Sequence, residues 1–287
     1  MTRLTSSDIE ALPTRLLDYD RYLRSATGRS LLEIGMAASG MEDGAFVRAV
    51  APTVTMAVVP IRSGLGIISG FTNTVCSILV HLGFNAQVTG NTDVAGFADA
   101  VEMGARVIMA ADDERFVAFC PNQGKIVDNS RTTANGFVAG LDLMAGGLAG
   151  KTVLVLGCGP VGRSAVHALL ARKAEVCVVD RETQKAAELA AWARDACRAS
   201  VQVSADAEQA LLTHDLIVDA TNAADVIHAR HVTASTRISA PGMPCGITAS
   251  ALEKLDRRIL HDPLQIGVAA MACEAVRIIL EARPGGV

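Results

Sequence analysis

The feature that most constrains this chain is a glycine-rich segment between an apolar strand and a helix. The expected strand covers residues 152–156, the expected helix runs to Arg172, and a second strand over 175–179 ends at Asp180. The segment between them fits G-x-G-x-x-G, which is weak evidence alone. In this strand–turn–helix–strand context, with an acidic residue about twenty positions downstream, it is the fingerprint of a dinucleotide-binding Rossmann unit.

Each glycine of the segment has a physical role in such a unit. Gly157 permits the tight turn, Gly159 lets backbone N–H groups approach a pyrophosphate, and Gly162 lets the helix pack closely on the strand. The helix N-terminus favours the negative charge, and a proline in the first turn loses no helical hydrogen bond. The predicted pyrophosphate site is therefore Gly157, Cys158, Gly159, Pro160, Val161 and Gly162.

Asp180 predicts the identity of the dinucleotide. Its carboxylate can accept both ribose hydroxyls and would repel a 2′-phosphate, which favours NAD, while the adjacent Arg181 keeps NADP open. We expect two later strand ends to lie over adenosine and nicotinamide, with Thr221, Asn222 and Pro241 as cofactor residues. These strand ends are Asp219-Ala220-Thr221-Asn222 and Ser239-Ala240-Pro241-Gly242. Ordinary turn chemistry explains the glycine and proline of those two segments about as well.

The order of expected elements predicts an α/β protein of two domains. Residues 55–104 alternate β-α-β-α, which indicates a small domain with parallel strands over 1–131, including N-terminal helices. Residues 132–287 are expected to form a doubly wound Rossmann domain, whose closing helix over 267–281 could pack back on the first domain. Near the N-terminus, Thr5 and Asp8 can cap a helix that Pro13 should interrupt or restart.

Composition argues for small-molecule chemistry. The net charge is −4 and no long Lys/Arg cluster occurs, so neither nucleic acid nor an anionic membrane is an expected partner. No apolar stretch would span a bilayer, and seven single cysteines without a C-x-x-C pair fit reduced thiols in the cytoplasm. His228 and His231 lack a third ligand, so no metal is predicted. A homodimer is left open.

Beyond the glycine segment, several less generic stretches match a known family. They are Leu4-Thr5 with Asp8, Val59-Pro60 with Ser63-Gly64 and Gly66-Ile67-Ile68, Asp93-Val94 with Gly96, Ala111-Asp112-Asp113 with Phe116, Gly124-Lys125-Ile126, Pro241-Gly242 with Pro244-Cys245, and Pro263-Leu264 with Ile266-Gly267. On these residues the chain resembles, from end to end, the pyrrolysine synthases, the dehydrogenases that complete pyrrolysine biosynthesis. The resemblance implies NAD-dependent oxidation of the terminal amine of L-lysine-Nε-3-methyl-D-ornithine, loss of ammonia and closure of the pyrroline ring.

The resemblance also implies a substrate pocket. It places Leu4 at the pocket through a closing N-terminal helix, and it makes Ser63 and Asp112 pocket residues. Where the family has Glu-Pro-Leu-Gly-Ile-Gly, this chain has a shorter carboxylate at Asp262 and a glutamine at Gln265. Hydride removal from an amine carbon needs groups that recognise ammonium and carboxylate, which suits Asp112 and Ser63 as the catalytic-site residues. Helix capping or a solvated turn remains the alternative for Asp112, and a glycine-rich turn for Ser63.

Two other functions fit the same residues. A shikimate, methylene-tetrahydrofolate or amino-acid dehydrogenase would need a cleft lysine, and Lys125 is the only lysine of residues 1–131. A dinucleotide-binding protein without turnover would fit the lack of an obvious acid–base residue.

Overall fold

The computed structural model describes residues 4–66 and 68–282, so Ile67 of the matching stretches lies outside the described residues. Residue contacts divide the chain into two compact units that are each discontinuous in sequence. Unit 1 comprises Met1–Arg21, Ser30–Gly136 and Pro263–Val287, and unit 2 comprises Tyr22–Arg29 and Phe137–Asp262. The expected boundary at 131/132 falls within helix α7 (Asn129–Ala145), and the C-terminal helix groups with unit 1.

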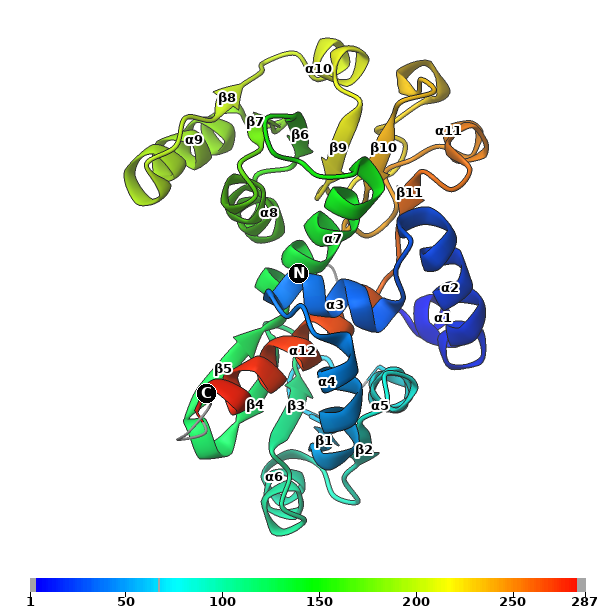
Figure 1. The fold of residues 1–287 in the computed structure, drawn as a ribbon, viewed down its shortest axis with the longest axis vertical. Helices are drawn as coiled ribbons and strands as arrows, with labels where there is room; N and C mark the ends of the chain where they lie inside the picture. Colours follow the sequence, from blue (N-terminus) through cyan, green and yellow to red (C-terminus); the bar gives the residue numbers. More distant parts are fainter. Residues whose placement is uncertain (1–3, 67, 283–287) are drawn as a thin grey trace. The chain divides into compact units, whose positions relative to one another are not determined.

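Unit 2 contains a parallel sheet of six strands in the order β11-β10-β9-β6-β7-β8 (Figure 1). This is the doubly wound order, with the direction of strand addition reversing between β6 and β9, where such sheets bind ligands. The strands are β6 (Thr152–Leu156), β7 (Glu175–Val179), β8 (Gln202–Val203), β9 (Leu216–Asp219), β10 (Arg237–Ser239) and β11 (Ile259–Leu260).

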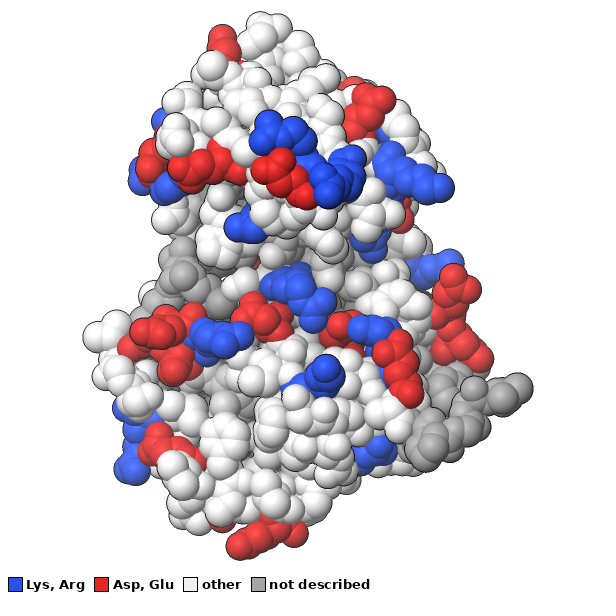
Figure 2. Space-filling model, turned by 90° about the vertical axis from the view of Figure 1, so that its left-hand side faces the viewer, with Lys and Arg blue, Asp and Glu red and all other residues white. Residues whose placement is uncertain are grey.

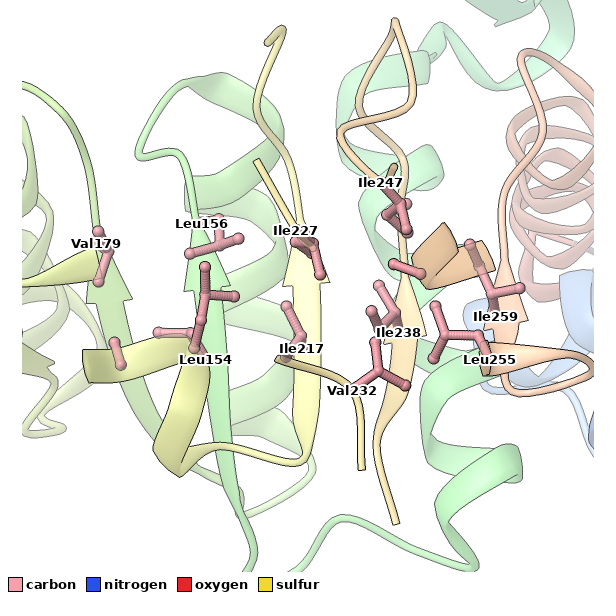
Figure 3. Packing of buried hydrophobic residues seen from close by; sticks show 14 of the residues in the cluster. Leu154, Leu156, Val179, Ile217, Ile227, Val232, Ile238, Ile247, Leu255 and Ile259 are labelled. Carbon is pink, nitrogen blue, oxygen red and sulfur yellow. The ribbon is translucent and has the colours of Figure 1, made fainter. Parts of the chain in front are cut away.

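The strands of this sheet carry the apolar core of unit 2. Four of the five residues of β6 and all four of β9 are buried, which explains their nearly continuous apolar sequence. Figure 3 shows Leu154, Ile217 and Ile238 from three neighbouring strands in one packed cluster. The helices of the unit are α8 (Pro160–Ala171), α9 (Thr183–Cys197), α10 (Ala207–Thr213), α11 (Ala249–Leu255) and the 3-10 turn η3 (Ala229–His231).

Unit 1 is built on a mixed sheet in the order β2-β1-β3-β4-β5. The first three strands are parallel, as the β-α-β-α pattern predicted, and a hairpin adds β4 and β5 antiparallel. The strands are β1 (Thr55–Val59), β2 (Asn85–Val88), β3 (Val107–Ala111), β4 (Phe116–Cys120) and β5 (Lys125–Asp128). The connecting elements are α5 (Phe71–His81), α6 (Asp93–Glu102) and the 3-10 turn η2 (Pro121–Gln123).

A long apolar helix, α12 (Gln265–Glu281), completes unit 1. Most of its residues are buried, because it packs against α3 (Leu31–Ser39), α5 and strands β4 and β5 (Figure 1). At Gly35 of α3 an added Cβ would lie 2.8 Å from the Ala269 carbonyl oxygen, so the two helices approach through their backbones. The sequence predicted α12 but not α3, α4 (Gly44–Val50) or η1 (Ala51–Thr53).

The N-terminal helices start as their sequence predicts. Thr5 and Asp8 form a capping box at α1 (Ser6–Ile9), with the Thr5 amide 2.7 Å from Asp8 Oδ2. A second helix, α2 (Leu12–Thr27), restarts at Pro13, whose missing N–H has no helical partner in a first turn.

The structure confirms the predicted α/β class with a Rossmann sheet in the second half. No described helix is long and apolar enough to cross a membrane. On the face in Figure 2, acidic and basic side chains are interspersed, and the basic ones form no continuous area.

Candidate functional site

The glycine segment forms the turn that its sequence predicts. Gly157 has a φ of 87°, and a Cβ there would lie 2.9 Å from the Ala220 carbonyl oxygen. A Cβ on Gly162 would collide with the Gly157 carbonyl oxygen, so α8 can pack this closely on β6 only with glycine at that position. Gly159 is the N-cap of α8, and nothing lies within 4 Å of the position where its Cβ would be.

These three positions pass a test for a bound pyrophosphate. The first and third glycines are fixed by contacts within the protein, whereas the second faces open space at the start of a twelve-residue helix. Open space beside a helix N-terminus is where a phosphate group would meet unpaired backbone N–H groups. The residues present therefore fit a dinucleotide.

Asp180 is tied to the glycine turn. It follows β7 directly, its Oδ2 accepts a hydrogen bond from the Cys158 amide at 2.7 Å, and its Oδ1 accepts one from the Glu182 amide at 2.9 Å. Each carboxylate oxygen can accept a further bond, so ribose hydroxyls can still be bound. Arg181 is exposed beside it.

The ends of β9 and β10 meet the glycine turn at the same edge of the sheet. The Thr221 amide and hydroxyl donate to Asp219 Oδ1 at 3.1 and 2.7 Å, and the Gly242 amide donates to the Asp219 carbonyl oxygen at 3.0 Å. Asn222 is exposed and Pro241 is half-buried in these loops. All the predicted cofactor residues thus gather at the carboxyl edge of one sheet within unit 2.

In unit 1, Ser63 and Asp112 lie in two loops that are joined to each other. The neighbour of Asp112, Asp113, accepts a hydrogen bond through Oδ2 from the Leu65 amide at 2.5 Å. A Cβ on Gly64 would collide with the same oxygen, and the φ of 70° at this position also favours glycine. Ser63 is exposed at the start of this turn.

The Asp112 carboxylate shapes its own turn. Its Oδ1 accepts the backbone N–H groups of Glu114 and Arg115, both at 2.8 Å. The Arg115 and Glu114 amides lower the pKa of Asp112 below its usual value, so the side chain is an anion at neutral pH. Asp112 therefore stabilises a turn, which is the alternative role that the sequence allowed for it. Its Oδ2 takes no part in these two hydrogen bonds.

Other charged residues at this end of unit 1 are already paired. Asp93, which belongs to one of the stretches that match the family, accepts hydrogen bonds from the Arg62 amide at 2.7 Å and from Arg62 Nε at 2.8 Å. The Arg62 hydrogen bonds lower the pKa of Asp93 to about 2. Asp93 therefore shapes the loop that carries Ser63.

The two remaining predicted substrate residues lie in different units. Leu4 is half-buried and immediately precedes the N-cap of α1 in unit 1. Asp262 ends unit 2 and is 5% exposed, and the next helix begins with Gln265, which is 4% exposed.

The histidine pair has a packing role. His228 is the N-cap of the 3-10 turn η3, and His231 is its last residue. The buried His231 accepts the His228 amide through Nδ1 at 3.1 Å and faces Glu208 Oε2 through Nε2 at 3.0 Å. No group of three His, Cys, Asp or Glu residues within the described ranges could hold a metal ion.

The cysteines behave as packing residues. All seven are free thiols. Burial raises the pKa of Cys158, in the glycine turn, to about 12, with Asp180 adding to the shift. This thiol is therefore neutral at physiological pH and a poor nucleophile.

The chain is similar to known proteins along most of its length. Residues 8–127 match the family described as pyrrolysine biosynthesis protein PylD, N-terminal domain. The pyrrolysine synthase of Methanosarcina acetivorans is 29% identical over 273 residues, which cover 94% of this chain and 98% of that protein. The chain is a relative of the pyrrolysine synthases. The enzyme of Methanosarcina barkeri is 28% identical over 281 residues, covering 94% and 97% of the two chains.

The Rossmann half of this pyrrolysine-synthase relative also matches dehydrogenases of another name. Residues 142–243 match the family described as shikimate / quinate 5-dehydrogenase. A quinate dehydrogenase from Corynebacterium glutamicum, solved with NAD, has a TM-score of 0.53 at 16% identity, covering 78% of this chain and 96% of its own. A shikimate dehydrogenase solved with NADP⁺ has a TM-score of 0.52 at 12% identity, covering 80% and 96%. These structures show the fold of an NAD(P)-dependent dehydrogenase.

One residue of the site was missed in the sequence. Asp219 is completely buried between the loops that carry Thr221 and Pro241, whereas the sequence placed it only at a strand end near the cofactor and gave its side chain no role. The available signal was an acidic residue that ends an otherwise apolar strand.

Proposed function

We propose that this chain is an NAD-dependent dehydrogenase that forms the pyrroline ring of pyrrolysine from L-lysine-Nε-3-methyl-D-ornithine. The observation that carries the proposal is the end-to-end relation to two pyrrolysine synthases, in a chain whose glycine turn fits a dinucleotide. The reaction oxidises the carbon that bears the terminal amine. When bound, NAD accepts the hydride from that carbon.

The residues of unit 2 hold the cofactor. The glycine turn and the N-terminus of α8 bind the pyrophosphate, and Asp180 binds the adenosine ribose. NAD is preferred to NADP because a 2′-phosphate would face the Asp180 carboxylate, already held in place by the Cys158 amide. Thr221, Asn222 and Pro241 line the remaining part of the site.

The residues of unit 1 bind the substrate. Asp112 is anionic, and only its Oδ1 accepts the two amides of the turn. Its Oδ2 can therefore accept a hydrogen bond from an ammonium group of the substrate. Ser63 can donate its hydroxyl to a carboxylate, and Leu4 supplies apolar contact. The oxidised carbon loses ammonia when the neighbouring α-amine attacks it, which closes the ring and releases a proton to water.

The deciding experiment supplies the purified chain with NAD and the lysyl-methylornithine isopeptide. We expect NADH absorbance to rise together with a pyrroline product that is identified by mass spectrometry. The same assay with NADP should be slower. Dinucleotide binding without turnover of this isopeptide would remove the proposed activity.

A second activity is compatible with the dehydrogenase fold, namely oxidation of a shikimate-like or amino-acid substrate. That chemistry would use a lysine, and Lys125 begins β5 with an exposed side chain at the end of the β4–β5 hairpin. Full activity of Lys125→Ala would count against it. A third function, dinucleotide binding without turnover, would be favoured if Asp112→Asn changed no measurable property.

A further inference from the structure

Asp219 has an unusual environment for a carboxyl group. Asp219 lies at the carboxyl end of β9 and is 0% exposed. Its Oδ1 accepts hydrogen bonds from the amide and the hydroxyl of Thr221. Within the described chain, Oδ2 is buried and makes no well-formed hydrogen bond, and the Gly246 amide interacts with the carboxylate only weakly. A buried oxygen without a well-formed hydrogen bond is costly, so packing alone does not account for a carboxyl group at this position.

The second oxygen is held against the loop that follows β10. A Cβ on Gly246 would collide with Asp219 Oδ2, and a Cβ on Gly242 would collide with the Thr221 carbonyl oxygen. The loop after β9 and the loop after β10 are therefore in contact through backbone atoms, with the Asp219 carboxyl group between them.

Backbone hydrogen bonds at Gly246 also join the loop after β9 to the loop after β10. The Gly246 carbonyl oxygen accepts the amides of Val226 and Ile227 at 2.7 and 2.8 Å. Ile227 and Ile247, both visible in Figure 3, form an isolated parallel bridge. Asp219 thus lies at the junction of residues 219–227 and 241–247.

The charged and titratable groups around the junction are few. Burial raises the pKa of Asp219, while the hydrogen bonds of Thr221, the charge of His261 and the Gly246 amide lower it by smaller amounts. Cys245, on the β10 loop, has its own pKa raised by burial and by Asp219. His261 Nδ1 donates to the Ala240 carbonyl oxygen at 2.8 Å, which directs this ring onto the end of β10.

In a doubly wound sheet the two halves bind the two nucleotides. Asp180 assigns the β6-β7-β8 half to adenosine, so the β9-β10-β11 half receives the other nucleotide. We propose that Asp219 is a positioning residue for the nicotinamide half of the cofactor, acting by holding the two loops after β9 and β10 in register. The inference rests on the proposed function, because it assumes that NAD is the ligand. Asp219 acts through the loops, since its own carboxyl group is buried.

The test compares two ligands that differ only in the nicotinamide. Binding of NAD and of ADP-ribose to the full chain is measured by calorimetry for the unaltered protein, Asp219→Ala and Asp219→Asn. Alanine removes the acceptor of both Thr221 bonds, so NAD binding should weaken by about ten-fold, equivalent to about 1.4 kcal/mol, with ADP-ribose binding unchanged. Asparagine keeps an oxygen for Thr221 and should restore most of the NAD affinity.

Two further variants complete the test. Asp215→Asn is the matched control: Asp215 lies at the opposite end of β9 and accepts the Thr233 and Ser235 hydroxyls at 2.7 Å, so its loss should leave the ratio of NAD to ADP-ribose affinity unchanged. Gly246→Ala pushes a methyl group against Asp219 Oδ2 and should reproduce the selective loss of NAD affinity. It decides the question if Asp219→Ala does not fold.

Equal weakening of both ligands, or no weakening of NAD, in Asp219→Ala and Gly246→Ala overturns the inference while leaving the proposed function intact. If the unaltered chain binds neither ligand, the proposed function fails, and the inference fails with it. If the unaltered chain binds ADP-ribose as tightly as NAD, the nicotinamide receives no positioning, and only the inference is overturned.

Discussion

At the scale of single residues, the Asp180 carboxylate does two things at once. It accepts the Cys158 amide of the glycine turn and it remains able to accept ribose hydroxyls. Asp180→Ala should therefore weaken NAD binding by about 2–3 kcal/mol, the value of a charge-assisted pair of hydrogen bonds, and should relax discrimination against NADP. Dissociation constants for both dinucleotides measure this. The control is Asp195→Ala, which replaces an exposed aspartate of α9 that is paired with Arg194. Unaltered NAD affinity in Asp180→Ala would show that Asp180 does not bind the adenosine ribose.

Asp219 also predicts a pH dependence of stability. Burial raises its pKa above the ordinary value of 3.8, so the folded state binds a proton more tightly than the unfolded chain does. Its contribution to stability is complete below that ordinary value and is lost as pH rises through the raised pKa. In urea unfolding, the free energy of unfolding of the wild type should fall relative to that of Asp219→Asn as the pH rises from the ordinary pKa of 3.8 through the raised pKa. A stability difference that is independent of pH would show that Asp219 ionises as an ordinary aspartate.

At the scale of elements, two glycines of the turn between β6 and α8 have different roles. Gly162 allows close packing, whereas Gly159 leaves room for a ligand. Gly162→Ala places a methyl group against the Gly157 carbonyl oxygen and should destabilise the fold by about 1–3 kcal/mol, as overpacking does. Gly159→Ala meets no atom within 4 Å, so it should leave the melting temperature unchanged while weakening NAD binding. Thermal melts and NAD titrations of both variants measure this. Equal melting temperatures, or unaltered NAD binding in Gly159→Ala, would contradict these roles.

The same elements show what a sequence can reveal. The apolar runs over 152–156 and 175–179 predicted the bounds of β6 and β7 as the structure has them, because buried parallel strands are apolar throughout. Helix α3 was missed because Leu31–Ser39 is short and apolar on most sides, and only the Ser30–Glu33 capping box marks its start. The cofactor turn was predictable because its signal is local. The burial of Asp219 was not, since it depends on Gly246, which lies 27 positions further along the chain.

At the scale of the whole molecule, chain order and spatial grouping differ. The two family matches cover residues 8–127 and 142–243, and neither includes α12. Nevertheless α12 belongs to unit 1, where Gly35, Gly136 and Gly267 allow close contact with α3 and α7. The N-terminal match therefore lacks a large part of the core of the unit that it identifies. Unit 1 can be completed only after the last helix has been synthesised.

This grouping predicts how fragments of the chain behave. Residues 1–136 alone would expose the faces of α3, β4 and β5 that α12 covers, so this fragment should not unfold cooperatively. Joining residues 263–287 to it through a flexible linker should restore a cooperative transition, because the helix returns the buried apolar surface of unit 1. Circular dichroism during thermal unfolding measures both. The control carries the same linker and a scrambled α12 sequence of equal composition. In this sequence the small residues no longer occupy the positions that contact α3 and α7. A cooperative transition in residues 1–136 alone would show that unit 1 does not depend on its C-terminal helix.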